Sequence, residues 1–181
     1  MAIAPYMRDF LDEWASLGGD VARRHKLPVS AMLACASIES NWGKGSIFLA
    51  TLNPFSLQKW PHIKYPITHN TYWSWTVVQT SPKISKKAPF NCATSRADAV
   101  RQWCEWILHY GEADGPPQDQ SSKVRQVAHS NAVAARNALL ISRNNPAAFA
   151  RGLSTVGFGE SRAKGILYAK RLTDFSMTDY D

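Results

Sequence analysis

Apolar residues recur three or four positions apart along the first forty residues, and this spacing predicts amphipathic helices over residues 5–19, 21–25 and 28–39. The first helix begins at Pro5 and is expected to end at Gly18-Gly19, with one face formed by Tyr6, Phe10, Leu11 and Trp14. The third begins at Pro28 and is apolar on nearly every side until it reaches Glu39. Such a helix is typical of a protein interior.

Residues 44–93 have a different pattern. Prolines interrupt the segment at positions 54, 61, 66, 82 and 89, and β-branched and aromatic residues fill the runs between them. These runs predict strands over residues 71–80 and 89–94. Trp73 and Trp75 alternate with Ser74, which places both indoles on the same face of the first strand. The segment is therefore interpreted as a small β lobe of strands and loops, inserted between helices.

Helical spacing resumes at Ser95, which forms a capping box with Asp98. Further helices are predicted over residues 121–142, 146–153 and 160–175, after a loop over 111–120. At 181 residues the chain is long enough for one domain with its own hydrophobic core. The prediction is a single α+β domain over residues 1–181, mainly α, with the β lobe over about 44–93.

Glu39 is the strongest candidate for chemistry, because it ends the apolar helix and no Asp or Glu follows until Asp98. Four tryptophans lie within that gap, at positions 42, 60, 73 and 75. An apolar wall favours the protonated carboxyl, which can donate its proton to a glycosidic oxygen, and indole faces can stack on sugar rings. The alternative is a helix-terminal glutamate that is solvated or paired with an arginine. The surroundings of Glu39 favour a glycosidase.

The formal net charge is +7 and the isoelectric point about 9.5, which favours an anionic polymer as partner. Nucleic acid and the bacterial cell wall both qualify, but the sequence has no helix-turn-helix, RNA-recognition or zinc-finger signature. No cofactor or metal site is predicted from the scattered histidines and the cysteines Cys35, Cys92 and Cys104, of which Cys92 and Cys104 could form a disulfide. No run is long enough for a membrane span, and the N-terminus has no secretory signature. The chain is therefore expected to be made in the cytoplasm without a signal peptide.

The segment Ser37-Ile38-Glu39-Ser40-Asn41-Trp42-Gly43 resembles the A-L-E-S-x-W-G element of bacterial glucosaminidases of glycoside hydrolase family 73, which have a lysozyme-like fold. Further segments are similar to landmarks of that family in the same order, namely Asn53 to Gln58, Phe90 to Ile107, Asn145-Pro146, Gly157-Phe158 and Tyr168 to Leu172. The resemblance covers about residues 20–175. It implies a lysozyme-like helical domain that hydrolyses peptidoglycan, with Glu39 as the catalytic acid.

Three departures from the family pattern matter. Phe158 stands where the family has a tyrosine, Ser56 stands where it has a glycine, and the β lobe lacks the second acidic residue of many members. A retaining or inverting enzyme needs a second carboxylate within about 5 to 9.5 Å of the acid. Either the 2-acetamido oxygen of the substrate attacks the anomeric carbon, which is the favoured route, or an acid from elsewhere reaches in, such as Glu112, Asp114 or Glu160.

The predicted substrate-binding residues are Ser40, Trp42, Asn53, Phe55, Gln58, Trp73, Trp75, Phe158 and Tyr168. A structural role is the alternative for several of them. Trp42 either packs beneath the Glu39 helix or contacts substrate, and Trp73 and Trp75 either line a sugar groove or cover the core of the lobe. Asn53 and Gln58 either orient an N-acetyl group or form a turn. Ser40 is either a helix-end hydrogen bonder or a functional hydroxyl.

The function expected is hydrolysis of the β-1,4 bond after N-acetylglucosamine in peptidoglycan glycan strands. A muramidase, a lytic transglycosylase and a non-catalytic wall-binding module are the alternatives. For delivery, an antibacterial effector injected into the periplasm of a neighbouring cell by a system such as type VI secretion is favoured over a phage endolysin. An effector of this kind should have a periplasmic immunity protein as its partner.

Overall fold

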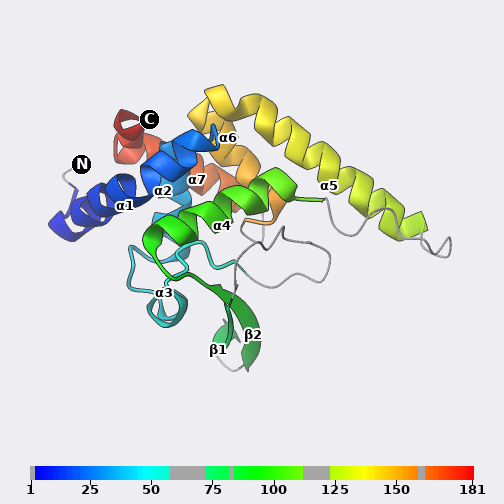
Figure 1. Cartoon of the computed structure of the whole chain (residues 1–181), viewed down its shortest axis with the longest axis horizontal. Coiled ribbons are helices and arrows are strands. Elements are labelled where there is room, and N and C mark those ends of the chain that lie inside the picture. The colour runs from blue at the N-terminus through cyan, green and yellow to red at the C-terminus, as the bar shows by residue number, and fades with distance from the viewer. Residues whose placement is uncertain (1–2, 58–71, 82–83, 112–122, 159–161) are drawn as a thin grey trace.

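The computed structural model describes residues 3–57, 72–81, 84–111, 123–158 and 162–181, with the backbone alone described for 72–81, 84–91 and 123–129. Its elements are α1 Pro5–Arg24, α2 Val29–Glu39, α3 Ser46–Thr51, β1 Tyr72–Ser81, β2 Ile84–Cys92, α4 Arg96–His109, α5 Lys123–Ile141, η1 Ser142–Asn144, α6 Pro146–Gly152, η2 Leu153–Val156, α7 Arg162–Asp174 and η3 Met177–Tyr180. Helices therefore dominate the described part of the chain, as the spacing of apolar residues predicts (Figure 1).

Helix α2 lies at the centre of the helical part of the molecule. Every side chain from Val29 to Ser37 is buried, and α1, α6, α7 and η3 all pack against the helix. Pro28, the predicted first residue of this helix, precedes it in an extended conformation and cannot offer a side-chain oxygen to the free N–H groups of the first turn. Asp181 supplies that cap instead: its carboxylate accepts from the Ser30 backbone N–H at 2.8 Å and from the Ser30 hydroxyl at 2.6 Å.

The prediction that a helix ends at Gly18-Gly19 is wrong, because α1 continues without a break to Arg24. Both glycines are buried. A Cβ atom at position 18 would lie 2.5 Å from Cγ2 of Val100 on α4. Glycine is needed here for the close approach of α1 to α4. In the sequence, this packing requirement looks the same as a helix end.

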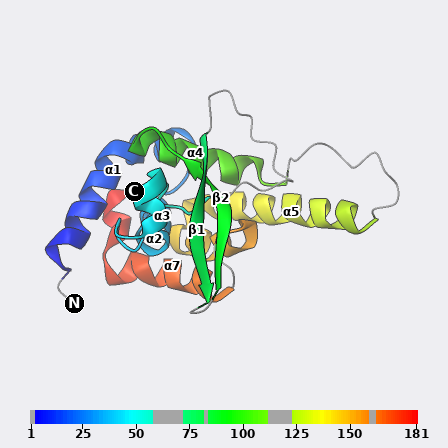
Figure 2. The ribbon, with the colours of Figure 1, turned by 90° about the horizontal axis from the view of Figure 1, so that it is seen from below.

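The predicted β lobe contains an antiparallel pair of strands that projects from the helices (Figures 1 and 2). Strand β1 has the predicted bounds within one residue, but β2 begins at Ile84 rather than at Pro89, and the helix α3 was not predicted. Pro89 pairs with Trp75 inside β2. A proline is tolerated there because each strand of a two-stranded sheet has an unpaired edge, so proline does not always end a strand.

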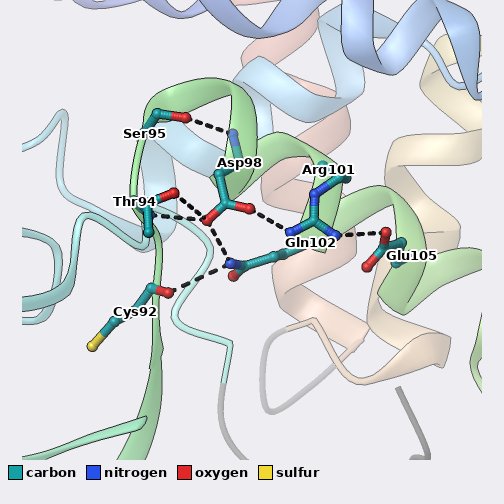
Figure 3. Close-up of polar contacts among 7 residues, drawn as sticks. All are labelled: Cys92, Thr94, Ser95, Asp98, Arg101, Gln102 and Glu105. Carbon is teal, nitrogen blue, oxygen red and sulfur yellow. Dashed lines mark hydrogen bonds and ion pairs between the residues drawn. The ribbon is translucent and has the colours of Figure 1, made fainter. Parts of the chain in front are cut away.

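A polar network joins the end of β2 to the start of α4 (Figure 3). The Ser95 hydroxyl accepts from the Asp98 N–H at 3.1 Å, which confirms the predicted helix cap. The Asp98 carboxylate accepts in return from the backbone N–H of Thr94 at 2.9 Å, and also from the Gln102 amide at 2.9 Å. Gln102 reaches the Cys92 carbonyl at 3.4 Å as well, so the network ties the hairpin to the helical core.

The C-terminal helices α5, α6 and α7 lie within three residues of their predicted bounds. Asn145 begins α6 by accepting a hydrogen bond from the Ala148 N–H at 3.1 Å. The cysteines Cys35, Cys92 and Cys104 are free, so Cys92 and Cys104 do not form a disulfide. None of the described helices is long and apolar enough to cross a membrane.

Replacing Asp98 should destabilise the fold in a pH-dependent way. Burial acts to raise the pKa of Asp98, but the hydrogen bonds from Thr94 and Arg101 outweigh it and lower the pKa. Asp98 therefore stabilises the folded chain above the unfolded-state pKa of about 3.9, and this contribution is lost as the pH falls through the lower folded-state pKa. We expect Asp98→Asn to lower the free energy of unfolding at pH 7 by about 1 to 3 kcal/mol.

Urea unfolding followed by circular dichroism at pH 7 and pH 3 tests this expectation. The difference in the free energy of unfolding between wild type and Asp98→Asn should be smaller at pH 3 than at pH 7. Asp174→Asn is the control, because Asp174 forms an exposed pair with Lys170 on α7 and should contribute little. If Asp98→Asn lowers the free energy of unfolding equally at both pH values, the role given to the Asp98 network is wrong.

Candidate active site around Glu39

Glu39 is the last residue of α2, and its side chain is 13% exposed. The nine residues of α2 before Ile38 are all buried, so the helix runs through the core and Glu39 lies where it leaves the core. A carboxyl in this position is shielded from most of the solvent but remains reachable. The sequence prediction that Glu39 ends a buried helix is confirmed.

Two side chains of α7 donate hydrogen bonds to the same oxygen of Glu39. Lys164 Nζ lies 2.8 Å from Oε1, and Tyr168 Oη lies 2.6 Å from it. Lys164 and Tyr168 are four residues apart, so they lie on the same face of the helix. Among the described residues, no group donates to Oε2.

Cys35 lies one helical turn before Glu39 and is completely buried. Burial, followed by the nearby charge of Glu39, raises the pKa of the Cys35 thiol well above its usual value. Burial also raises the pKa of Tyr168 far above the usual range, and the neighbouring Cys35 and Glu39 add to the effect. Both groups therefore keep their protons at any ordinary pH, and the Tyr168 hydroxyl is available as a donor to Glu39.

The backbone after Glu39 contains an unusual concentration of residues in the left-handed region. Asn41, Trp42 and Gly43 have φ values of 48°, 57° and 78°, followed by Leu52 at 53° and Ser56 at 51°. Non-glycine residues adopt such values at an energetic cost, and these conformations are found frequently at functional sites. Ser56 stands where the resembling family has glycine, and its φ explains why glycine suits that position.

Ser40 and Trp42 have structural contacts. The Ser40 hydroxyl donates to the Ala36 carbonyl at 2.6 Å and accepts from the Gly43 N–H at 2.9 Å, so it stabilises the end of α2. Trp42 is 8% exposed and packs edge-on against Phe10 and Phe175. The structure thus gives both residues the structural role that the sequence left open, and contact with substrate stays a prediction.

Asn53 and Phe55 fix the loop that follows α3. The Asn53 side chain accepts from the Phe55 N–H at 3.1 Å and donates to the Leu57 carbonyl at 3.1 Å, which holds a turn. Phe55 is buried and stacks on Trp103 with 5.5 Å between ring centroids. The Ser56 hydroxyl donates to the backbone carbonyl of Glu39 at 3.4 Å, so this turn lies directly beside the acid.

The remaining predicted residues fall into two groups. Tyr168 contacts Glu39, whereas Phe158 is buried against Trp103 and Trp106 and belongs to the core. Gln58, Glu112, Asp114 and Glu160 lie outside the described residues, and the side chains of Trp73 and Trp75 are not described. Roles predicted for that second group stay predictions.

Lys164 was not identified from the sequence. It is one of many basic residues in this chain, and nothing near it in the sequence distinguishes it. Its spacing of four residues from Tyr168 on a predicted helix is the one available signal, since that spacing places both on one face. Only the packing of α7 against α2 reveals that this face meets Glu39.

The described residues contain no group of three or more His, Cys, Asp or Glu side chains that could hold a metal ion. The polar groups that surround Glu39 in that part of the chain are an ammonium, a phenol and a thiol. This set can place and exchange a proton on a carboxyl group.

The fold is that of known peptidoglycan hydrolase domains. The structure matches the catalytic domain of the autolysin Auto from Listeria monocytogenes with a TM-score of 0.61 and 16% identity, covering 100% of this chain and 90% of that one. It matches a peptidoglycan hydrolase mutant from Sphingomonas sp. A1 with a TM-score of 0.56 and 16% identity, over 95% and 96% of the two chains. A glycoside hydrolase domain of FlgJ from Salmonella typhimurium matches with a TM-score of 0.55 and 17% identity, over 96% and 95%.

No protein-family model and no curated protein sequence matches this chain. At identities of 16 to 17%, the structural matches establish the fold. They confirm the prediction of a mainly helical, lysozyme-like domain with a small β lobe.

Gly165 is expected to be essential for the position of α7 and hence for the contacts to Glu39. A Cβ atom at position 165 would lie 2.2 Å from the backbone carbonyl oxygen of Arg151 on α6. We expect Gly165→Ala to separate the two helices, lowering the free energy of unfolding by about 1 to 3 kcal/mol, the usual cost of overpacking. Urea unfolding measures the loss.

Gly152→Ala is the matched control. Its added methyl group would meet only the end of the flexible Leu139 side chain, at 2.8 Å, which can move. Gly152→Ala should therefore be destabilised less than Gly165→Ala. Equal stabilities of the two variants would show that the α6–α7 contact is not the constraint described here.

Proposed function

We propose that this protein is a peptidoglycan hydrolase that cleaves the β-1,4 bond after N-acetylglucosamine, with Glu39 as the general acid. The observation that carries the proposal is the Glu39 carboxyl itself, largely buried at the end of α2, with one oxygen held by Lys164 and Tyr168 and the other without a partner among the described residues. The names of the structural neighbours, an autolysin and peptidoglycan hydrolases, support the same substrate.

In the proposed reaction Glu39 donates a proton to the glycosidic oxygen as the bond to the anomeric carbon breaks. The 2-acetamido oxygen of the same sugar forms a bond to that carbon and gives a cyclic oxazolinium intermediate. The Glu39 carboxylate then takes a proton from water, and the resulting hydroxide equivalent opens the ring. This route needs one enzymic carboxyl and suits a β lobe without Asp or Glu.

The decisive prediction is that Glu39→Gln folds but loses nearly all activity. A glutamine amide has the size of the carboxyl but cannot give up a proton, and general acid catalysis contributes about 10² to 10⁴-fold. Purified wild type and variant would be incubated with peptidoglycan, and the released muropeptides identified by mass spectrometry. The wild type should produce new reducing ends on N-acetylglucosamine.

The products distinguish the alternatives. Reducing ends on N-acetylmuramic acid would identify a muramidase, and anhydro-muramic products a lytic transglycosylase. A wall-binding module would bind sacculi without releasing any fragment. Glu105→Gln is a control, because Glu105 pairs with Arg101 on α4 and has no contact with Glu39. Activity of Glu39→Gln above a tenth of the wild type would rule out Glu39 as the acid.

For the place of action, we propose that the protein works in the periplasm of a target cell as an antibacterial effector. The chain carries a formal net charge of +7, which suits an anionic wall. The same charge suits an acidic immunity protein, because charge complementarity speeds association.

Expression in a bacterial host tests this proposal. The chain should be toxic when a periplasmic signal peptide is attached and harmless when it stays in the cytoplasm, because peptidoglycan lies outside the inner membrane. Co-expression of the protein encoded by the adjacent gene should relieve toxicity, and Glu39→Gln serves as the control for hydrolysis. If the neighbouring protein neither protects nor binds, the endolysin alternative replaces the effector.

A further inference from the structure

The ion pair between Lys164 and Glu39 is unexpected beside a general acid. The Lys164 ammonium lies 2.8 Å from Oε1 of Glu39, whereas a general acid has to carry a proton before it can donate one. The geometry of the contact indicates what Lys164 does.

Both donors on α7 approach the same carboxyl oxygen. A protonated carboxyl has one O–H donor and one carbonyl oxygen that can only accept. The Lys164 ammonium has donors only, and the Tyr168 hydroxyl donates to Oε1 at 2.6 Å. Because Oε1 accepts from both, it is the carbonyl oxygen of the protonated acid, and the proton has to reside on Oε2.

We propose, on the basis of the function proposed above, that Lys164 is a positioning residue for Glu39. Together with Tyr168 it selects Oε2 as the oxygen that delivers the proton. It also stabilises the negative charge that develops on Glu39 while the proton moves to the glycosidic oxygen.

The second effect acts on the transition state. The carboxyl is neutral before the transfer and negative after it, so a cation fixed beside it stabilises the transition state more than the protonated ground state. Lys164 is 35% exposed, and water screens part of this interaction. Lys164 thus speeds the transfer of the proton from Glu39 to the glycosidic oxygen.

Other titratable groups near Glu39 do not compete for this role. Among the described residues, those in its surroundings are Lys164 and Tyr168 from α7 and Cys35 from α2. Burial raises the pKa of both Tyr168 and Cys35, so neither loses its proton in the range where a glycosidase works. A change in kcat after substitution of Lys164 therefore reports on its contact with Glu39.

The experiment compares Lys164→Met, Lys164→Arg and Lys170→Met by measuring kcat and KM on peptidoglycan fragments. Lys164→Met should lower kcat about tenfold and leave KM unchanged, because Lys164 acts on the transition state and not on substrate binding. Lys164→Arg keeps the charge and should retain most of the wild-type kcat.

Lys170→Met is the control on the same helix, because Lys170 pairs with Asp174 and has no contact with Glu39. Its kcat and KM should equal those of the wild type. A wild-type kcat in Lys164→Met would overturn the proposal, and so would an equal loss of kcat in Lys164→Arg, since that pattern indicates only structural damage.

A high-resolution crystal structure of Glu39→Gln without substrate gives a readout that does not depend on activity. The glutamine carbonyl should accept from Lys164 and Tyr168, and an amide nitrogen that faces Lys164 would overturn the proposal. Tyr168→Phe, which removes the other donor, should also lower kcat and replaces Lys164→Met if that variant does not fold. An inactive wild type with the expected amide orientation would contradict the proposed function but leave the selection of Oε2 established, so the two failures can be told apart.

Discussion

The burial of α2 is the constraint on which the rest of this structure depends. A helix that is apolar on every side has to be enclosed, and α1, α6, α7 and η3 together provide the enclosure (Figure 1). The polar ends of such a helix then become the points where chemistry is possible. Asp181 caps the free N–H groups at its start, and Glu39 stands at its other end.

Close helix packing brings the partners of Glu39 into place. Gly165 allows α7 to approach α6 at a distance that no other residue permits, and Lys164 and Tyr168 flank that glycine. The two side chains reach across to α2 from a helix that begins more than 120 residues later in the chain. The geometry of one carboxyl oxygen thus depends on a backbone contact between two other helices.

Local patterns predicted the helices well and their contacts poorly. The apolar run before Glu39 identified the buried helix, and the Ser95–Asp98 cap was recognised because both of its residues lie within one turn. Gly18 was misread as a helix end, since a close helix contact and a terminus require the same residue. Pro89 was misread for a similar reason, because a proline inside an edge strand and a proline in a loop look alike in sequence.

The residues of the candidate site show the same contrast between local patterns, which the sequence reveals, and contacts between helices, which it does not. Glu39 was identified from the apolar helix that it ends, and Tyr168 from a segment that resembles a known family. Ser40, Trp42 and Phe55 lie near Glu39 in sequence but have packing or hydrogen-bonding roles. Lys164 was missed because its importance arises from a contact across 125 positions of sequence. The sequence therefore indicated Glu39 as a candidate, and only the fold revealed its contact with Lys164.

A crystal structure of Glu39→Gln with a bound peptidoglycan glycan fragment would test the central claim most directly. Lys164 and Tyr168 donate to Oε1, so the glutamine carbonyl should face them and its amide nitrogen should take the place of Oε2. The account predicts that the glycosidic oxygen lies about 3 Å from this nitrogen. A fragment bound away from Glu39, or one whose glycosidic oxygen approaches from the side of Lys164, would contradict it.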